Sequence, residues 1–201
     1  MERLDRQMRF VAEIGRLKGV LRQTTLAGSG LNRPENSAEH SWHLAMMVLV
    51  LGEHAPPGTD LGKVTAMVLL HDLVEIDAGD LFLYADADQQ ARQEIAERAA
   101  ADRIFAILPA EQEVCLRQLW DEFNERQTTE SKFARAIDRL QPMLENLTAG
   151  GGTWQRHGVT ADQVLAKVRL IEDGSAVLGT LARSLVAQAV AAGILAPSPA
   201  T

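Results

Sequence analysis

The 201-residue sequence contains one cysteine, Cys115, so an internal disulfide bond is excluded. Aromatic residues make up only 4% of the chain, whereas alanine, leucine, arginine and glutamate are plentiful, a balance that favours helices over sheets. No uncharged apolar run approaches the roughly 20 residues that a membrane-spanning helix needs. No charged and then apolar leader precedes the first periodic segment. We therefore expect a cytoplasmic protein that does not enter a membrane.

Basic residues are also in the minority, because 20 lysines and arginines face 27 aspartates and glutamates and the net charge is -7. Nucleic acid polymers are bound mainly through clustered lysine and arginine, so we expect no such partner. A small anionic ligand held by a metal ion remains compatible with this charge. With 46% hydrophobic residues, the chain is long enough for one well-buried core. These features predict an all-α, single-domain protein.

Apolar residues spaced three or four apart predict a half-buried helix in the first 17 residues. Residues 19–38 contain Gly19, Gly28, Gly30 and Pro34 with little periodicity, which predicts a long loop that ends near Ser37.

The remaining helices are predicted from periodicity, caps and helix breakers. Pro142 lies inside one of them, and apolar periodicity continues beyond it. Thr160 and Gln163 form a capping-box pattern at the start of another. The predicted ranges are 38–54, 60–79, 86–108, 109–126, 128–149, 160–172 and 175–192.

One imidazole and four carboxylates follow an apolar run in the stretch HDLVEIDAGD, residues 71–80. On a continuous helix, His71 and Glu75 would share a face, and Asp72 could converge with His71 on one ion. Buried unpaired charge is costly, so such a cluster needs a cation or an exposed surface. The alternative is a helix end with solvated acids and a histidine favoured by the helix dipole.

Two further candidate ligands occur where helices could meet. His40 lies in NSAEHSWHLAMMVLV, directly after the predicted loop, and Asp138 lies in KFARAIDRLQPM within an otherwise apolar stripe. A lone aspartate in such a stripe needs a partner, and Arg135 or Arg139 is an alternative to a metal ion.

Together, NSAEH at 36–40, HDLVEIDAGD at 71–80 and KFARAIDRL at 132–140 resemble the HD-domain metal phosphohydrolases, in particular their 5'-deoxynucleotidase branch. The similarity covers most of residues 10–148. The resemblance implies that Glu75 handles protons and that Asp80 is a second acidic helper. It implies that the metal ligands are His40, His71, Asp72 and Asp138.

By the same resemblance, residues 1–201 form one HD domain, with a metal-site core at about 36–142 and C-terminal helices at 160–195 packed on it. Two imidazoles and two carboxylates suit one divalent ion such as Mn, Co, Fe, Ni, Zn or Mg, with open positions for water and a phosphate oxygen. Residues 73–137 contain no histidine, which favours one ion over two. The family further implies a homodimer, for which the alanine-rich final helix offers an apolar surface.

The substrate implied by the resemblance is a small phosphomonoester, in particular a deoxynucleoside 5'-monophosphate. The nucleotidase branch carries a tryptophan in the loop after its first helix, and RQTTLAGSGLNRP at 22–34 has none. Arg22 and Arg33 are candidate phosphate contacts, because guanidinium groups match phosphate oxygens, although both could be solvated loop residues.

Two alternative functions remain. A hydrolase of the alarmone (p)ppGpp would tend to have adjacent Glu and Asp after the HD pair, where this chain has Glu75, Ile76 and Asp77. A noncatalytic nucleotide-binding module would use its metal structurally and leave Glu75 solvated.

Overall fold

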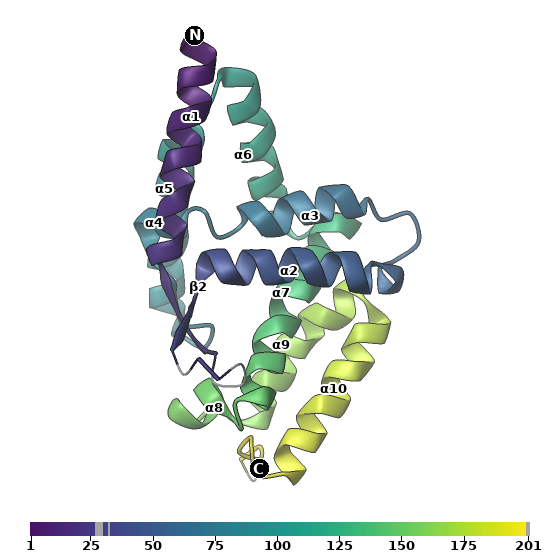
Figure 1. Ribbon diagram of the computed structural model, residues 1–201. Helices are drawn as coiled ribbons and strands as arrows, with labels where there is room; N and C mark the ends of the chain where they lie inside the picture. Colours follow the sequence, from purple (N-terminus) through teal and green to yellow (C-terminus); the bar gives the residue numbers. More distant parts are fainter. Residues whose placement is uncertain (27–29, 32, 200–201) are drawn as a thin grey trace.

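A computed structural model describes residues 1–26, 30–31 and 33–199 and confirms the all-α fold (Figure 1). Two 3₁₀ helices, η1 (Gly15–Gly19) and η3 (Gly52–His54), follow the first two α-helices. The α-helices are α1 Glu2–Ile14, α2 Ser37–Leu51, α3 Leu61–Leu70, α4 Glu75–Ala78, α5 Ala87–Phe105, α6 Ala110–Glu125, α7 Thr129–Thr148, α8 Gly152–Arg156, α9 Ala161–Gly174 and α10 Ala176–Ala191.

Side-chain caps explain where several helices begin. Four helices begin with a capping box, in which the N-cap side chain accepts from the backbone N–H three residues later and the side chain of that later residue accepts from the N-cap N–H. The N-cap residues are Asn36, Asp86, Thr128 and Thr160. The predicted capping box at Thr160 is confirmed. The N-cap of α2 is Asn36 and not Ser37, because the Asn36 amide oxygen accepts from the first-turn backbone N–H groups.

The main core lies where α2 and α3 cross α7, and α9 and α10 cover α7 farther along (Figure 1). Apolar side chains from these helices are wholly buried, including Leu44, Val64, Phe133 and Ile137. No helix in the described part of the chain is both long and apolar enough to span a bilayer.

The final helix turns part of its apolar surface toward its own chain. Leu178, Ala182 and Val186 of α10 are buried in the same core cluster as Val168 and Ile171 of α9. This part of the helix is unavailable to a second copy, whereas Val177 and Leu181 of the same helix remain 58% and 45% exposed.

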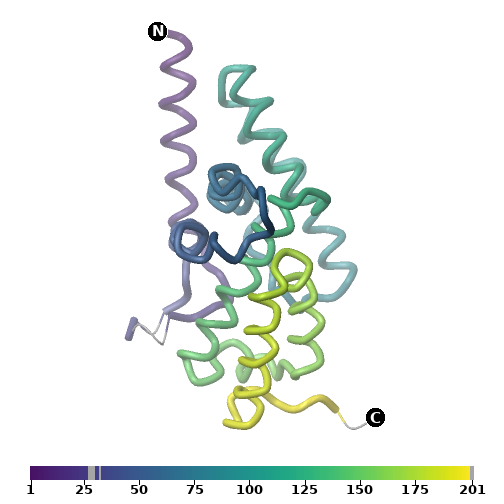
Figure 2. Tube along the Cα trace, turned by 90° about the vertical axis from the view of Figure 1, so that its right-hand side faces the viewer, coloured from purple at the N-terminus to yellow at the C-terminus, as the bar shows by residue number. Residues whose placement is uncertain are grey.

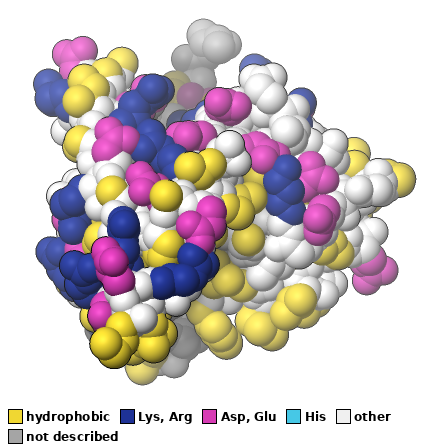
Figure 3. Space-filling model, turned by 90° about the horizontal axis from the view of Figure 1, so that it is seen from above, with side chains coloured by type: hydrophobic (Ala, Val, Ile, Leu, Met, Phe, Trp, Pro, Cys, Tyr) yellow, Lys and Arg dark blue, Asp and Glu magenta, His cyan; other side chains and the backbone are white. Residues whose placement is uncertain are grey.

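The first helix extends away from the body beside α5 and α6 (Figures 1 and 2). Phe10 is its one buried residue, and ion pairs join Arg3 to Glu111 of α6 and Glu13 to Arg103 of α5. From the end where α1 begins, acidic and basic side chains are seen interspersed over the surface (Figure 3). The molecule is thus held together at this end by mixed surface charge as well as by apolar contacts.

The half-buried first helix predicted from periodicity is only partly correct. Its apolar residues Leu4, Met8 and Val11 remain 59%, 57% and 56% exposed. Because α1 projects past the core, only its last turns reach apolar neighbours. Periodicity alone does not report how far a helix extends beyond its domain.

The predicted long loop at 19–38 is wrong in part, because it contains two antiparallel strands, β1 (Leu21–Thr25) and β2 (Pro34–Asn36). Leu21 pairs with Asn36, and Thr25 pairs with Pro34. These strands are short and mostly polar, so they lack the alternating pattern that identifies a half-buried strand. Residues 27–29 and 32 of this prediction lie outside the described residues.

The single helix predicted from residue 60 to residue 79 is also corrected. The α3 helix ends at Leu70, a turn covers residues 71–74, and α4 follows as a separate short helix. Gly79 ends α4 with a φ of 74°, a conformation that glycine adopts readily. The HD pair therefore lies in a turn at the end of a half-buried helix.

Candidate metal centre

His40 enters the site from the first turn of α2 and is wholly buried. Its Nε2 atom lies 3.1 Å from Asp138 Oδ1, and its Nδ1 atom lies 3.1 Å from Gln141 Oε1. An amide oxygen only accepts, so Nδ1 carries the proton and donates to Gln141. This leaves the lone pair of Nε2 directed into the site.

His71 is oriented in the same way from the turn after α3. Its Nδ1 atom lies 2.9 Å from the Val68 carbonyl oxygen, which requires a proton on Nδ1. The indole N–H of Trp120 donates to the His71 carbonyl oxygen at 3.1 Å and fixes the backbone of the turn. Both histidines thus present Nε2 to one point.

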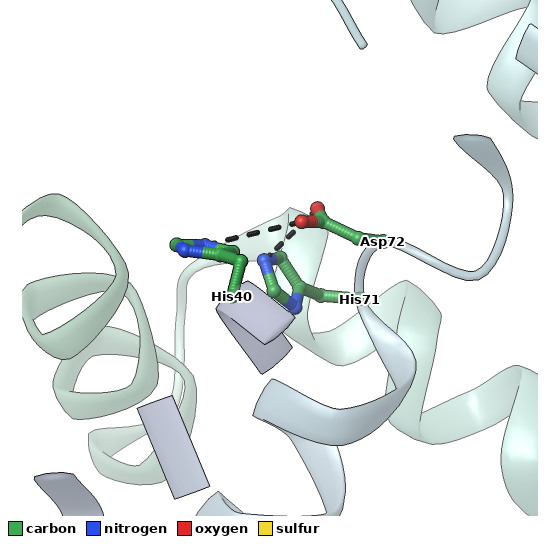
Figure 4. Close-up of side chains that lie close together, drawn as sticks. All are labelled: His40, His71 and Asp72. Carbon is green, nitrogen blue, oxygen red and sulfur yellow. Dashed lines mark ion pairs between the residues drawn. The ribbon is translucent and has the colours of Figure 1, made fainter. Parts of the chain in front are cut away.

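The carboxylates of Asp72 and Asp138 adjoin the two imidazoles. Ligand atoms of His40, His71 and Asp72 all lie within 4.8 Å of one another (Figure 4). Asp138, from α7, places Oδ1 3.1 Å from His40 Nε2 and 3.6 Å from His71 Nε2. The four predicted ligands therefore come together from α2, the turn at residues 71–74 and α7.

Burial and neighbouring charge set the ionisation of this group. Burial raises the pKa of Asp72 and of Asp138, but adjacent cations outweigh it and hold both values well below the usual range. For Asp72 the main opposing group is His71, and for Asp138 it is Arg139. Burial lowers the pKa of His71, yet the Asp72 carboxylate raises it to about 10. The pocket thus favours negative carboxylates and positive charge beside them.

These residues fit a divalent transition metal. His71 Nε2 is buried and lies 2.9 Å from Asp72 Oδ1, but among the described residues no acceptor is aligned for a hydrogen bond with it. Because Nδ1 carries the proton, Nε2 holds a buried lone pair without a partner, and a cation at this point would accept that lone pair. Two imidazoles with two carboxylates suit Mn, Fe, Co, Ni or Zn better than they suit Mg²⁺, because Mg²⁺ prefers ligands that are all oxygen.

Glu75 and Asp80 lie beside this group on the cavity wall. Glu75 is buried and accepts a hydrogen bond of 2.6 Å from the Ser37 hydroxyl. Burial and the Asp72 charge raise its pKa well above the ordinary value. Asp80 accepts from the backbone N–H of Gln23 at 3.2 Å, and burial raises its pKa as well.

The two arginines predicted to contact substrate have different surroundings. Arg22, on β1, lines the cavity and donates to Asp72 Oδ2 at 2.8 Å, with Asp80 Oδ1 3.7 Å away. Arg33 is exposed and pairs with Glu39 through both terminal nitrogens, and it does not line the cavity found in the described residues. The hairpin therefore brings one arginine to the centre and leaves the other at the surface.

The centre opens into a cavity of about 490 Å³, a volume typical of small-ligand sites. Acidic and basic residues line it together with the aromatic side chains of Phe82, Tyr84 and Trp154. The site can therefore hold a small, charged molecule that also has a flat apolar part.

A second group with potential ligand atoms, Glu35, His43 and Glu145, lies behind His40. The Gln141 amide nitrogen lies between these three side chains, 2.9 Å from Glu35, 3.4 Å from Glu145 and 3.3 Å from His43. Because this N–H₂ group has to donate to carboxylates, the amide oxygen must face His40. We interpret the group as a hydrogen-bond network that holds Gln141, and not as a second metal site.

Gln141, Glu35 and Ser37 were missed in the sequence. Gln141 lies three residues after Asp138, on the same face of a helix, so helical spacing could have identified it. Glu35 and Ser37 flank Asn36 just before His40. Their burial could not be foreseen, because it depends on the strand pairing of β1 with β2.

Replacing Gln141 tests its part in orienting His40. Gln141→Leu removes the acceptor for His40 Nδ1–H, so we expect metal affinity to fall about 10- to 100-fold. Competition with a chromophoric chelator measures this directly. Gln188→Leu, at an exposed position of α10, is the matched control and should keep normal affinity. Equal affinities in the two variants would exclude this role for Gln141.

An all-helical fold with two histidines and two aspartates from three chain segments defines a class of protein, and comparison with known proteins identifies it. Residues 14–177 match the family model described as HD domain. The chain therefore belongs to the HD domain family.

Particular relatives agree with this assignment. The solved structure of a predicted metal-dependent phosphohydrolase from Magnetospirillum magnetotacticum is 47% identical, has a TM-score of 0.91, and is matched over 98% of this chain and 100% of that one. The bovine and human 5'-deoxynucleotidases HDDC2 are 28% and 27% identical over 69% of this chain. The matched region spans 65% of the length of each of these two relatives.

Proposed function

We propose that this protein is a metal-dependent phosphohydrolase acting on small nucleotides, with deoxynucleoside 5'-monophosphates as the first substrates to test. The observation that carries the proposal is the approach of His40, His71, Asp72 and Asp138 to one point at the wall of a cavity. The names of the bovine and human relatives support the nucleotide substrate. The noncatalytic alternative requires a solvated Glu75, whereas Glu75 is buried beside the ligands.

A bound divalent ion would polarise the phosphate and lower the pKa of its water. In the reaction, a water oxygen forms the new bond to phosphorus, the bond to the sugar oxygen breaks, and that oxygen leaves with a proton. Glu75 is suited to the proton step, because burial and Asp72 keep its pKa above the ordinary value for a carboxyl group. Ser37 orients one Glu75 oxygen and leaves the other available.

Arg22 would orient the phosphate. Its guanidinium pairs with Asp72 at 2.8 Å and also lies near Glu35 and Asp80, and a metal ion on Asp72 would compete for the Asp72 carboxylate. The arginine could then donate to a phosphate oxygen from the same cavity wall. Asp80 would hold the Arg22 side chain near this position.

A substrate panel tests the proposed function. We expect the protein, depleted of metal and reloaded with Mn²⁺ or Co²⁺, to release phosphate from deoxynucleoside 5'-monophosphates and to lose this activity when the metal is chelated. The panel should include nucleoside di- and triphosphates, phosphodiesters and (p)ppGpp. A rise in Tm with these compounds, without release of phosphate from any of them, would support the noncatalytic module instead.

The expected homodimer and cytoplasmic location remain predictions. Light scattering coupled to size-exclusion chromatography measures the first, and localisation of a tagged chain measures the second.

A further inference from the structure

Four basic side chains form one wall of the cavity, and the proposed chemistry leaves them unused. Arg126 lies at the end of α6, Arg135 and Arg139 lie on α7, and Lys167 lies on α9. We call these four residues the cationic wall. It starts beside the metal centre, because Arg135 and Arg139 both adjoin Asp138.

The cationic wall has too few counter-ions. Arg135 and Arg139 approach the same oxygen, Asp138 Oδ2, at 3.3 Å and 3.6 Å. Among the described residues, no carboxylate lies within 4.0 Å of a charged nitrogen of Arg126 or Lys167, although acidic residues also line the cavity, among them Asp121 and Glu125 of α6. A metal ion on Asp138 would engage the one carboxylate that serves two arginines. The wall would then be even less neutralised.

Burial makes this excess charge costly. Arg135 is only 7% exposed, and its Nε atom has no hydrogen-bond acceptor among the described residues, as is also true of Arg139 Nε. The Arg135 guanidinium lies 4.1 Å from the centre of the Phe123 ring, which stabilises it only in part. Unmatched buried cations cost free energy unless an anion binds near them.

The basic residues also repel one another. Burial, followed by the charges of Arg139 and Arg126, lowers the pKa of Lys167. Like charges that share one cavity raise the local concentration of anions and bind them strongly when water is excluded. This pattern is that of an anion site and not of a network of internal ion pairs.

The position of Lys167 separates this site from the metal centre. Its Nζ atom lies 6.0 Å from the centre of the Tyr84 ring, in the part of the cavity that the loop after α4 and the α9 helix enclose. Arg22 and the metal ligands are suited to the phosphate that is hydrolysed. The cationic wall thus reaches from the metal ligand Asp138 to the part of the cavity that α9 lines.

We propose that the cationic wall binds a second phosphoryl group, so that the preferred substrate is a nucleotide with two phosphoryl groups. This inference rests on the proposed phosphohydrolase function and makes its substrate class more specific. The second group is held and not transferred. In a nucleoside bisphosphate, the bond from phosphorus to the sugar oxygen breaks as described above. In a nucleoside diphosphate, water forms the new bond to the terminal phosphorus, the bond to the bridging oxygen breaks, and the nucleoside monophosphate leaves with the proton. A nucleoside diphosphate and a nucleoside bisphosphate both supply this chemistry.

The test compares deoxyadenosine 5'-monophosphate, deoxyadenosine 5'-diphosphate and deoxyadenosine 3',5'-bisphosphate as substrates of the metal-loaded protein. We expect a higher kcat/KM for one of the two doubly phosphorylated compounds, and which one identifies the source of the second group. In Lys167→Ala, the ratio of this kcat/KM to that for the monophosphate should fall about tenfold, because one charged hydrogen bond is lost.

Two controls make the result decisive. Lys18→Ala removes an exposed lysine outside the cavity and should leave the ratio unchanged. If Lys167→Ala does not fold by circular dichroism, Lys167→Gln replaces it. Calorimetry with inorganic pyrophosphate on the metal-free protein gives a readout without turnover, and we expect binding to weaken in the Lys167 variant.

The outcomes separate the two proposals. Release of phosphate from all three nucleotides with the same ratio in wild type and Lys167→Ala would overturn the second-phosphoryl site and leave the phosphohydrolase proposal standing. If none of the three nucleotides releases phosphate, but pyrophosphate binds and its binding depends on Lys167, the hydrolase proposal is overturned and the anion site is supported.

Discussion

Asp72→Ala is expected to leave the protein without bound metal and to reduce turnover by more than about 100-fold. Changes in residues that merely support a ligand usually cost about 10- to 100-fold, so removal of a ligand should cost more. Asp72 is central to the geometry, since its carboxylate lies near both imidazoles. Metal content by elemental analysis and phosphate release measure the two effects.

Asp162→Ala is the control for this experiment, because Asp162 is an exposed acid in the first turn of α9. It should retain the metal-to-protein ratio and the activity of the wild type. The Asp72 variant also leaves Arg22 without its nearest partner, so folding should be checked by circular dichroism. A folded Asp72→Ala protein with the wild-type metal content would refute the ligand assignment.

Glu75→Gln is expected to make the metal-free protein more stable while it removes most of the activity. Burial and the Asp72 charge disfavour a negative Glu75, so a neutral amide of the same shape removes an unfavourable charge from the folded state. Its oxygen can still accept from Ser37. We expect Tm to rise by about 2–4 °C at pH 8, the shift that about 1 kcal/mol gives in a chain of this size. Differential scanning calorimetry measures it.

The pH dependence of this gain follows from the raised pKa of Glu75. Below the pKa of an unfolded glutamate, about 4.3, the side chain is neutral in both states and Gln has no advantage. As the pH rises, the unfolded state loses its proton first, so wild type becomes less stable relative to the variant until Glu75 ionises in the folded state too. Glu53→Gln, at an exposed position, should show no such trend. A stability difference for Glu75→Gln that stays constant from pH 4 to pH 8 would contradict this explanation.

The sequence predicted the helices well wherever a local signal exists. The capping box at Thr160 lies within a few residues of the helix that it starts. The positive φ at the end of α4 is one that glycine adopts without strain, and Gly79 stands there. The strands at 21–25 and 34–36 depend on pairing between polar segments and on burial of Glu35, so no local pattern indicates them. The break between α3 and α4 likewise depends on contacts such as that of Trp120 with the His71 carbonyl.

Part of the site could likewise be read from the sequence. His40, His71, Asp72 and Asp138 were identified by residue type and motif, and the structure places them together. The supporting residues were missed, because the hydrogen bond from His40 to Gln141 joins positions 101 residues apart. The cationic wall was also invisible, since it requires α6, α7 and α9 to meet, and Arg135 and Arg139 appeared only as partners of Asp138.

The most direct test of the metal centre is the anomalous scattering of crystals grown with Zn²⁺. We expect one strong peak at about 2.0–2.2 Å from His40 Nε2, His71 Nε2 and carboxylate oxygens of Asp72 and Asp138. An ion bound instead by Glu35, His43 and Glu145, or no ion at the four residues at saturating Zn²⁺, would contradict the account.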